Sequence, residues 1–343
     1  ELASGASGVA AGMLAPVAEA AFGEGALLDL NLDGAARWPD FAAELAAASA
    51  EDPGYRRCGT LLVARDRDAA EALARELEFR RSLALPVESL RPSEARRLEP
   101  ALAPRIRAAL HVHDDHAVDP RALTASLAAA IERAGGELHT GAEVAALELV
   151  DQRVCGLRLR DGGRVGVGDV VIAAGAWSSG LGGIPDDAQV PIRPVKGQIL
   201  RLRDPTGASL LERVLRMDTA YVVPRGNGDY VLGATVEERG WDLSVTAGAV
   251  YELLREAEEV LPGVAELELV EARAGLRPGT PDNAPAIGPS RVVGLHWATG
   301  HYRHGVLLAP VTAELVVAGV AGEQLPELAA PFAPERFATG VVA

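Results

Sequence analysis

The chain has 343 residues, of which 48% are hydrophobic and 24% are charged, and its formal net charge is −15. This balance is typical of a folded globular protein and excludes a disordered one, and the length predicts two domains or one domain with a large insertion. The negative charge argues against nucleic acid and anionic membrane surfaces as partners, because both need clustered Lys and Arg.

The chain opens on ELASGASGVAAGMLAP, a run of small residues without the side-chain volume to build a core. We expect its backbone to lie pressed against another part of the protein or against a ligand. Helical periodicity follows over residues 35–50 and 68–83, and between them residues 58–66 have the apolar pattern of a strand.

The run HVHDDH at residues 111–116 resembles a metal-ligand cluster. In a strand, His111 and His113 would lie on one face, with Asp114, Asp115 and His116 beside them. No further ligand motif accompanies the run, and it directly precedes a helix. We therefore interpret it as a connecting segment and predict no metal site.

The segment 119–136 is the best-marked helix, because it starts with an Asp-Pro pair and ends at a Gly-Gly pair. Strand patterns follow over residues 142–149, 155–163 and 164–175. The last of these ends in a continuous apolar run, which is typical of a central strand covered on both faces.

Antiparallel signals dominate after about residue 190, including a hairpin with Asn-Gly at its turn. Elements typical of α/β folds thus flank a block typical of antiparallel β folds. We predict an α/β fold in which a discontinuous doubly wound, Rossmann-like nucleotide domain carries an inserted antiparallel β domain. The predicted elements of this half are a strand over 197–203, the hairpin over 221–235, a helix over 247–263, strands over 266–279 and 292–301, and a helix from about 305.

The two cysteines, Cys58 and Cys155, are too few for a disulfide framework and lack CxxC spacing. This usage predicts free thiols and a reducing cytoplasm. The longest apolar stretch, residues 305–322, contains a proline and a glutamate and is shorter than the roughly 20 residues of a membrane span. We also predict no signal peptide, because no basic region precedes an apolar segment at the N-terminus.

Two strand ends are candidates for ligand contact. VVIAAGAWSS at 170–179 runs from a strand into small residues, as at a cofactor-binding strand end, although the same pattern occurs without a ligand. ATGHYRHGVLLAP at 298–310 places a loop between a strand and a helix. Free N–H groups and the positive end of the helix dipole would favour an anion there. The alternative is an ordinary strand-to-helix turn.

Arg277 and Tyr221 are candidates for binding a carboxylate. Arg277 stands before a proline at the end of a predicted strand, and its guanidinium can bind a carboxylate through two parallel hydrogen bonds. Tyr221 begins the hairpin, where its hydroxyl could complete such a site. The alternatives are a surface arginine in a salt bridge and a core tyrosine.

Seven segments together resemble, in order and over essentially the whole chain, the flavin-dependent glycine oxidases of thiazole biosynthesis in the D-amino acid oxidase family. The last two are the most specific. They are GASGVAAGMLAP, GELHTGAEVAAL, VVIAAGAWS, PVKGQIL, YVVPR, AGLRPGTPDNAPAIG and GHYRHGVLLAP.

The resemblance implies a noncovalent FAD, because the loop at residues 300–308 has no cysteine to which a flavin could attach. It implies that Arg277 and Tyr221 bind the substrate carboxylate and that Arg303 orients the amine end. Val144 matches a position beside the adenine. The other implied cofactor contacts are Ala6, Ser7, Ala11, Gly12, Met13, Ala174, Gly175, Trp177, His301, Tyr302, Arg303, His304, Gly305, Val306 and Leu307.

The chain departs from the family pattern in three places. The family begins with a strand and a GxGxxG turn for the pyrophosphate, and we expect this N-terminal βα unit to be missing here. Thr219 stands where a pocket histidine is expected, and Val236 replaces a pocket methionine. These two changes bear on substrate range rather than on carboxylate binding.

The resemblance implies an enzyme that oxidises glycine and other small amino acids with oxygen, giving the imine or 2-oxo acid, ammonia and hydrogen peroxide. It leaves open a homo-oligomer and hand-over of product to thiazole synthesis enzymes. Alternatives are a D-amino acid dehydrogenase that reduces a quinone, a sarcosine-type oxidase and a flavin-free binding protein. The implied domains are an FAD-binding domain over 1–55, 114–193 and 283–343, and a substrate-binding domain over 56–113 and 194–282.

Overall fold

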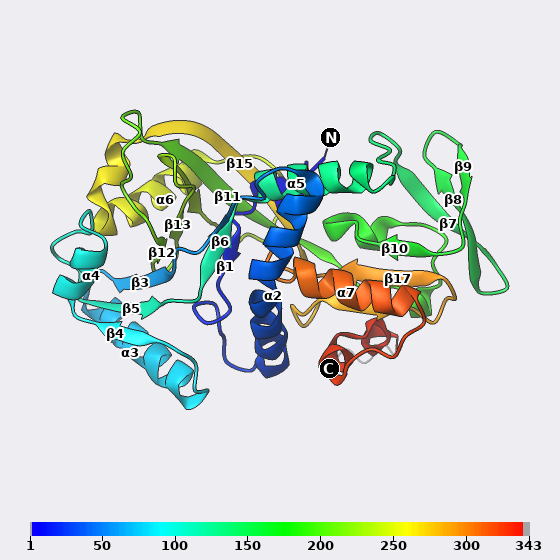
Figure 1. Ribbon diagram of the computed structural model, residues 1–343, viewed down its shortest axis with the longest axis horizontal. Helices are drawn as coiled ribbons and strands as arrows, with labels where there is room; N and C mark the ends of the chain where they lie inside the picture. Colours follow the sequence, from blue (N-terminus) through cyan, green and yellow to red (C-terminus); the bar gives the residue numbers. More distant parts are fainter. Residues whose placement is uncertain (1, 339–343) are drawn as a thin grey trace.

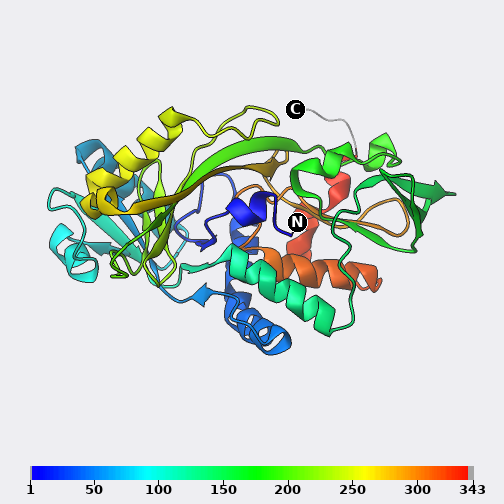
Figure 2. The same ribbon diagram turned by 90° about the horizontal axis from the view of Figure 1, so that it is seen from above.

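The computed structural model describes residues 2–338, and its largest element is an eight-stranded mixed sheet in the order β15-β11-β14-β13-β12-β3-β5-β4 (Figure 1). The long antiparallel pair β11 and β15 runs from this sheet toward the middle of the molecule (Figure 2). The strands are β3 (Thr60–Ala64), β4 (Glu88–Leu90), β5 (Ala108–Val112), β11 (Arg193–Arg203), β12 (Val214–Arg216), β13 (Tyr221–Pro224), β14 (Asp229–Gly233) and β15 (Glu268–Gly279).

Three smaller sheets have the orders β1-β6-β2, β10-β17-β16 and β7-β8-β9. In the second, β10 pairs with β17 in parallel, as α/β folds require. Their strands are β1 (Met13–Leu14), β2 (Tyr55–Arg56), β6 (His116–Val118), β7 (Val144–Val150), β8 (Arg153–Leu159), β9 (Arg164–Gly166), β10 (Val170–Ile172), β16 (Ala286–Pro289) and β17 (Leu295–Thr299).

The helices divide into two groups. In the middle of the molecule α2 packs against α5 and α7, while α3, α4 and α6 cover the eight-stranded sheet (Figures 1 and 2). The α-helices are α1 (Ala6–Val9), α2 (Gly25–Ser49), α3 (Arg67–Ser82), α4 (Pro92–Leu98), α5 (Pro120–Arg133), α6 (Ala247–Val260) and α7 (Ala309–Val320). Short 3-10 helices are η1 (Gly175–Gly180), η2 (Asp186–Ala188), η3 (Pro262–Glu266), η4 (Glu327–Phe332) and η5 (Pro334–Phe337).

Strand β3 shows how the sheet is covered on both faces. Leu61 and Val63 pack in the core that includes residues of α4 and α6. Leu62 and Ala64 point the other way and pack with α3 and the segment after β1. Successive side chains of a strand point to opposite faces, so one short apolar strand serves two cores. The predicted α/β class is confirmed, with the antiparallel block between α/β-type elements.

Local signals positioned several elements correctly. Asp119 caps α5 by accepting a hydrogen bond from the N–H of Arg121 at 3.0 Å. The hairpin β13–β14 turns at residues 225–228, where Gly226 and Gly228 have positive φ. Helix α2 begins earlier than predicted, at Gly25, and continues through Pro39. Cys58 and Cys155 are both free thiols.

Strand β10 was predicted to be buried on both faces, and that prediction was wrong. Among the residues that the structure describes, β10 lies at the edge of its sheet, next to β17 only. Val171 is consequently 41% exposed. Helix α7 also begins later than predicted, at Ala309, because residues 305–308 form turns before it.

The strands of the eight-stranded sheet come from residues 60–112 and 193–279, whereas β7–β10 (144–172) and β16 and β17 (286–299) form other sheets. On this basis we propose the two domains expected from the resemblance, an FAD-binding domain (1–55, 114–193, 283–343) and a substrate-binding domain (56–113, 194–282). Residue 1 and residues 339–343 of this division lie outside the described part of the chain. Within residues 2–338, no helix combines the length and the apolar character that membrane crossing requires.

Asp115, from the HVHDDH run, is a structural residue. Its fully buried carboxyl group accepts hydrogen bonds from the backbone N–H groups of Val17 and Ala18, at 3.2 and 2.6 Å. Burial raises the pKa of Asp115 to about 7, although these hydrogen bonds oppose the shift. This structural role of Asp115 agrees with the interpretation of the run as a connecting segment.

We expect Asp115→Asn to remove part of the pH dependence of stability. Because the folded-state pKa is raised above 3.8 to about 7, the folded protein binds a proton in this window that the unfolded chain does not. Asp115 therefore contributes stability at low pH that is lost as the pH rises through about 7. Between about pH 5 and pH 8, the wild type should lose roughly 2 kcal/mol of unfolding free energy relative to the variant. Urea unfolding at both pH values measures this difference, and parallel pH profiles would contradict it.

Candidate active site

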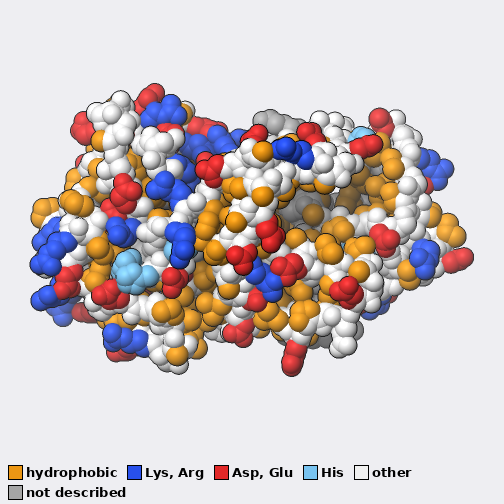
Figure 3. All heavy atoms as spheres, viewed as in Figure 1, with side chains coloured by type: hydrophobic (Ala, Val, Ile, Leu, Met, Phe, Trp, Pro, Cys, Tyr) orange, Lys and Arg blue, Asp and Glu red, His pale blue; other side chains and the backbone are white. Residues whose placement is uncertain are grey.

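A cavity of about 1310 Å³ is lined by residues of both the eight-stranded sheet and the β10-β17-β16 sheet. Its walls come from α5, β10, β13, β15, the opening loop (residues 5–15, including the short helix α1) and the loop before α7 (residues 301–308). Figure 3 shows the surface hollowed between α5 and β10. The lining includes every predicted site residue except one: Ala6, Ser7, Ala11, Gly12, Met13, Ala174, Gly175, Trp177, Tyr221, Arg277, His301, Tyr302, Arg303, His304, Gly305, Val306 and Leu307.

The exception is Val144, which lies outside the cavity lining. It is the first residue of β7 and pairs with Leu159 of β8. The structure thus does not bring Val144 together with the other predicted contacts, and its place beside an adenine stays a prediction.

The opening loop forms one wall of the cavity because it has almost no side chains. Gly12 has a φ of 75°, and a Cβ there would lie 2.0 Å from the carbonyl oxygen of Val118. Val9, on the same loop, packs so closely on Gly275 of β15 that a Cβ at Gly275 would lie 3.0 Å from its Cβ. The small-residue run is therefore backbone pressed against β6, α5 and β15, with its other side facing the cavity.

The opposite wall is the loop at residues 301–308. Tyr302 has a φ of 48° and its N–H donates to the carbonyl of Pro278 at 3.0 Å, which ties the loop to β15. Among the described residues, the N–H groups of Gly305, Val306 and Leu307 have no protein acceptor. Three free donors next to the N-terminus of α7 make this wall suited to a negatively charged or carbonyl-rich ring.

Two histidines of this loop are neutral near pH 7. Burial lowers the pKa of His301 to about 4, and the nearby His304 lowers it further. Burial likewise lowers the pKa of His304 to about 4, although Glu19 opposes the shift. His301 Nε2 is hydrogen-bonded to the hydroxyl of Thr312 at 2.9 Å, so this ring braces the loop against α7.

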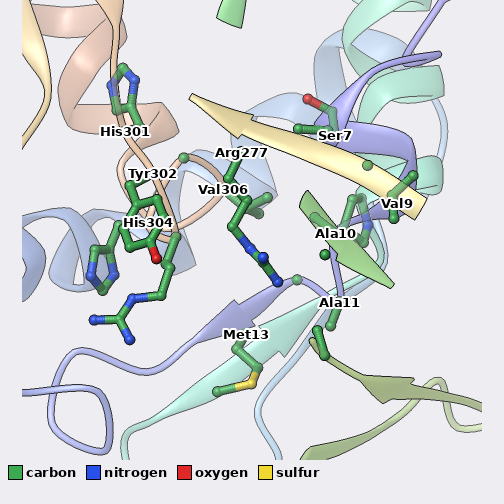
Figure 4. A pocket seen from close by; sticks show the side chains of 18 of the residues that line it. Ser7, Val9, Ala10, Ala11, Met13, Arg277, His301, Tyr302, His304 and Val306 are labelled. Carbon is green, nitrogen blue, oxygen red and sulfur yellow. The ribbon is translucent and has the colours of Figure 1, made fainter. Parts of the chain in front are cut away.

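Arg277 presents its guanidinium between the two loops (Figure 4). One nitrogen, Nη1, donates to the backbone carbonyls of Lys196 and Thr235 at 3.3 and 3.1 Å. Within residues 2–338, no carboxylate lies within 4.0 Å of Arg277, so Nε and Nη2 keep their donors for a ligand. The surface salt bridge considered as an alternative is therefore absent from the described part of the chain.

Two glycines make room for this pair of polar side chains. A Cβ at Gly197 would lie 2.4 Å from both terminal nitrogens of Arg277, and a Cβ at Gly233 would lie 2.8 Å from the hydroxyl of Tyr221. Burial raises the pKa of Tyr221, and the nearby Arg277 opposes this shift. Tyr221 is therefore a neutral hydrogen-bond donor beside a cation, an arrangement suited to a small carboxylate.

Arg303 lies at the exposed side of the same loop. Its guanidinium is 5.5 Å from the ring centroid of Tyr302, and no acidic side chain within residues 2–338 pairs with it. The structure thus brings both predicted cavity arginines to the site, and neither forms a salt bridge within the described residues.

Sequence reasoning missed Glu19 and Arg216, which also line the cavity. The Nε of Arg216 donates to Glu19 at 2.9 Å. Burial alone would raise the pKa of Glu19, but Arg216, Arg303 and His304 outweigh it and leave the pKa lowered. Glu19 is therefore a half-buried carboxylate that balances the positive charge of this wall. Neither residue lies in a periodic or motif-like pattern, so no local signal could have found them.

The two positions that depart from the family pattern lie at the cavity wall. The hydroxyl of Thr219 donates to Glu256 at 3.2 Å, whereas Val236 is 61% exposed. Because Val236 is so exposed, the cavity wall is open to solvent on this side.

The model of one protein family, described as FAD dependent oxidoreductase, matches residues 1–318. A glycine oxidase from Geobacillus kaustophilus is 34% identical over 336 residues, which are 97% of this chain and 88% of that protein. A crystal structure of glycine oxidase from the same organism superimposes with a TM-score of 0.89, at 32% identity, over 99% of this chain and 90% of that one.

Two further relatives carry other names. Hydrogen cyanide synthase subunit HcnC from Pseudomonas aeruginosa is 33% identical over 91% of this chain and 75% of its own length. The bifunctional protein ThiO/ThiG from Synechocystis is 32% identical over 99% of this chain, which spans only 49% of that longer protein.

Proposed function

Since the chain belongs to the FAD dependent oxidoreductase family, we propose that it oxidises glycine and other small amino acids with oxygen. The products are the imine or 2-oxo acid, ammonia and hydrogen peroxide. The observation that carries the proposal is Arg277, a cation beside Tyr221 that lines the cavity without a carboxylate partner among the described residues. The similarity to glycine oxidase over nearly the whole chain supports the choice of substrate.

FAD is the cofactor of this family, and the walls of the cavity fit its ring system. The opening loop offers flat, side-chain-poor backbone, and the wall at residues 305–307 offers the free N–H donors. When bound, FAD accepts the equivalent of a hydride from the substrate α-carbon and passes the electrons to oxygen.

We propose noncovalent binding, so acid precipitation should release all of the flavin into the supernatant.

We propose that the protein's own groups position the substrate rather than exchange protons with it. Arg277 binds the carboxylate through its two free donors, and the hydroxyl of Tyr221 donates a further hydrogen bond. The segment at Arg303 orients the amine end. Since the half-buried His301 and the buried His304 are neutral, they add no charge to this wall and help to exclude water.

The substrate range includes more than glycine. Val236 stands where the family pattern has a longer methionine, and it leaves this wall open. One methylene in an apolar pocket typically changes the transition-state energy by only about 1–3 kcal/mol. Sarcosine and D-alanine are therefore substrates too, with rates overlapping that of glycine.

Supply of a product to thiazole synthesis is the proposed cellular role. Its support is the relative named ThiO/ThiG, in which a region similar to this chain is joined to a second part. The cytoplasmic location and a homo-oligomer are expectations that rest on the cysteine content and on the resemblance.

The relative HcnC favours a second candidate, a subunit of a hydrogen cyanide synthase. Product analysis separates the two. Holoenzyme supplied with glycine and oxygen should form hydrogen peroxide and glyoxylate in equal amounts, without cyanide. Release of cyanide would favour the second candidate. Flavin reduction that only an added quinone reverses would favour a dehydrogenase.

A further inference from the structure

A second cluster of polar residues lies on the edge of the eight-stranded sheet, away from the cavity. Glu88 is the first residue of β4, the edge strand, and it pairs directly with His111 of β5. His113 follows β5 two residues after His111. These three side chains do not line the cavity described above. In Figure 3, histidine side chains reach the surface over β5.

The three side chains converge on one point. His113 Nε2 is 3.0 Å from Glu88 Oε2, and His111 Nδ1 is 3.9 Å from the same oxygen. One ligand atom from each of the three lies within 4.8 Å of the others. Ligand atoms around a tetrahedral zinc ion, with bonds of about 2.0–2.1 Å, are roughly 3.4 Å apart. Small rotations of the exposed Glu88 and His113 side chains would bring all three to that spacing.

His111 is the strongest sign that something binds here. Its side chain is only 6% exposed, and Nδ1 has no hydrogen-bond partner among the described residues. A buried imidazole nitrogen without a hydrogen-bond partner costs stability unless a ligand satisfies it.

The charges around the cluster permit a cation. Glu88 supplies a negative charge next to both rings. Arg213 also faces His111, but its guanidinium is ion-paired with the buried Glu99 at 3.0 Å. Two imidazoles and one carboxylate suit a borderline divalent metal ion such as Zn²⁺ better than Mg²⁺ or Ca²⁺, which prefer oxygen ligands alone.

We propose that Glu88, His111 and His113 form a site for one Zn²⁺-like divalent metal ion. The ion binds the Nδ1 atom of His111, and water completes the coordination of the ion on the exposed side. Since Glu88 belongs to β4 and the histidines belong to β5 and the residue just after it, the metal fastens the three-residue edge strand to its neighbour. Its role is structural, and the oxidation chemistry proceeds without it.

Titration of tag-free, full-length holoenzyme with ZnCl₂ tests the proposal by calorimetry. The wild type should bind one equivalent of Zn²⁺ saturably, and MgCl₂ should give no heat of binding. Glu88→Gln and His113→Ala should each weaken Zn²⁺ binding at least about tenfold. Both positions are more than half exposed, so the variants should fold normally.

The matched control is His139→Ala. His139 also lies beside a carboxylate, 2.9 Å from Glu137, but within residues 2–338 this exposed pair has no third ligand. The control should bind Zn²⁺ as the wild type does. Two results would overturn the proposal: no saturable Zn²⁺ binding by the wild type, or binding that Glu88→Gln and His113→Ala leave unchanged.

Discussion

Replacing Arg277 by methionine should lower kcat/KM for glycine about a hundredfold while the protein keeps its FAD. The substitution removes the two free donors that we assign to the substrate carboxylate, a charge-assisted contact worth roughly 3 kcal/mol. Methionine keeps much of the side-chain volume over Gly197. Steady-state oxygen consumption with glycine, together with the flavin absorbance of the purified variant, measures both quantities.

Arg203→Met is the control for this experiment. Arg203 lies on β11 and pairs with Asp229 at 2.7 Å, outside the cavity. Its loss should leave kcat/KM within a factor of about two, since exposed ion pairs contribute little. If Arg277→Met oxidises glycine within a few-fold of the wild type, the assignment of the carboxylate site is wrong.

Gly12→Ala should weaken FAD binding at least about tenfold and lower the free energy of unfolding by several kcal/mol. Gly12 has a φ of 75°, and its new methyl group would lie 2.0 Å from the carbonyl oxygen of Val118. Neither the opening loop nor β6 can move away without altering the cavity wall. Flavin content after purification and the concentration of urea at half-unfolding measure the two effects.

Gly23→Ala is the matched control. Gly23 has a similar φ of 82°, but a Cβ there meets nothing within 4 Å. This control carries the backbone strain of a left-handed alanine, about 1–2 kcal/mol, without the steric clash. It should keep its FAD. Equal loss of FAD in both variants would show that the close packing at Gly12 is unimportant for the cofactor.

Elements with local signals could be predicted from the sequence. The Asp-Pro start of α5 and the Asn-Gly turn between β13 and β14 depend on neighbouring residues, and both lie where predicted. The exposure of β10 could not be predicted in this way. An apolar run indicates burial, but which strands pair beside it depends on distant parts of the chain.

The same distinction applies to the candidate site. Arg277 and the loop at residues 301–307 stood out because of strand ends and glycines, and the structure brings them to one cavity. Glu19 and Arg216 are 197 positions apart, and only the folded chain puts them together. In the HVHDDH run, His113 lies just after β5 rather than in the predicted strand, but the rings of His111 and His113 still lie 3.9 Å apart. Glu88 belongs to another strand, β4, so the sequence pattern could not identify it as the third proposed ligand.

The most direct test of the central claim is anaerobic mixing of the FAD-loaded protein with glycine, sarcosine, D-alanine and D-proline, followed by flavin absorbance. We predict that glycine bleaches the flavin, that sarcosine and D-alanine do so at overlapping rates, and that air restores the colour with release of hydrogen peroxide. Bleaching by bulky D-amino acids at least a hundredfold faster than by glycine would contradict the account, as would a flavin that no small amino acid reduces.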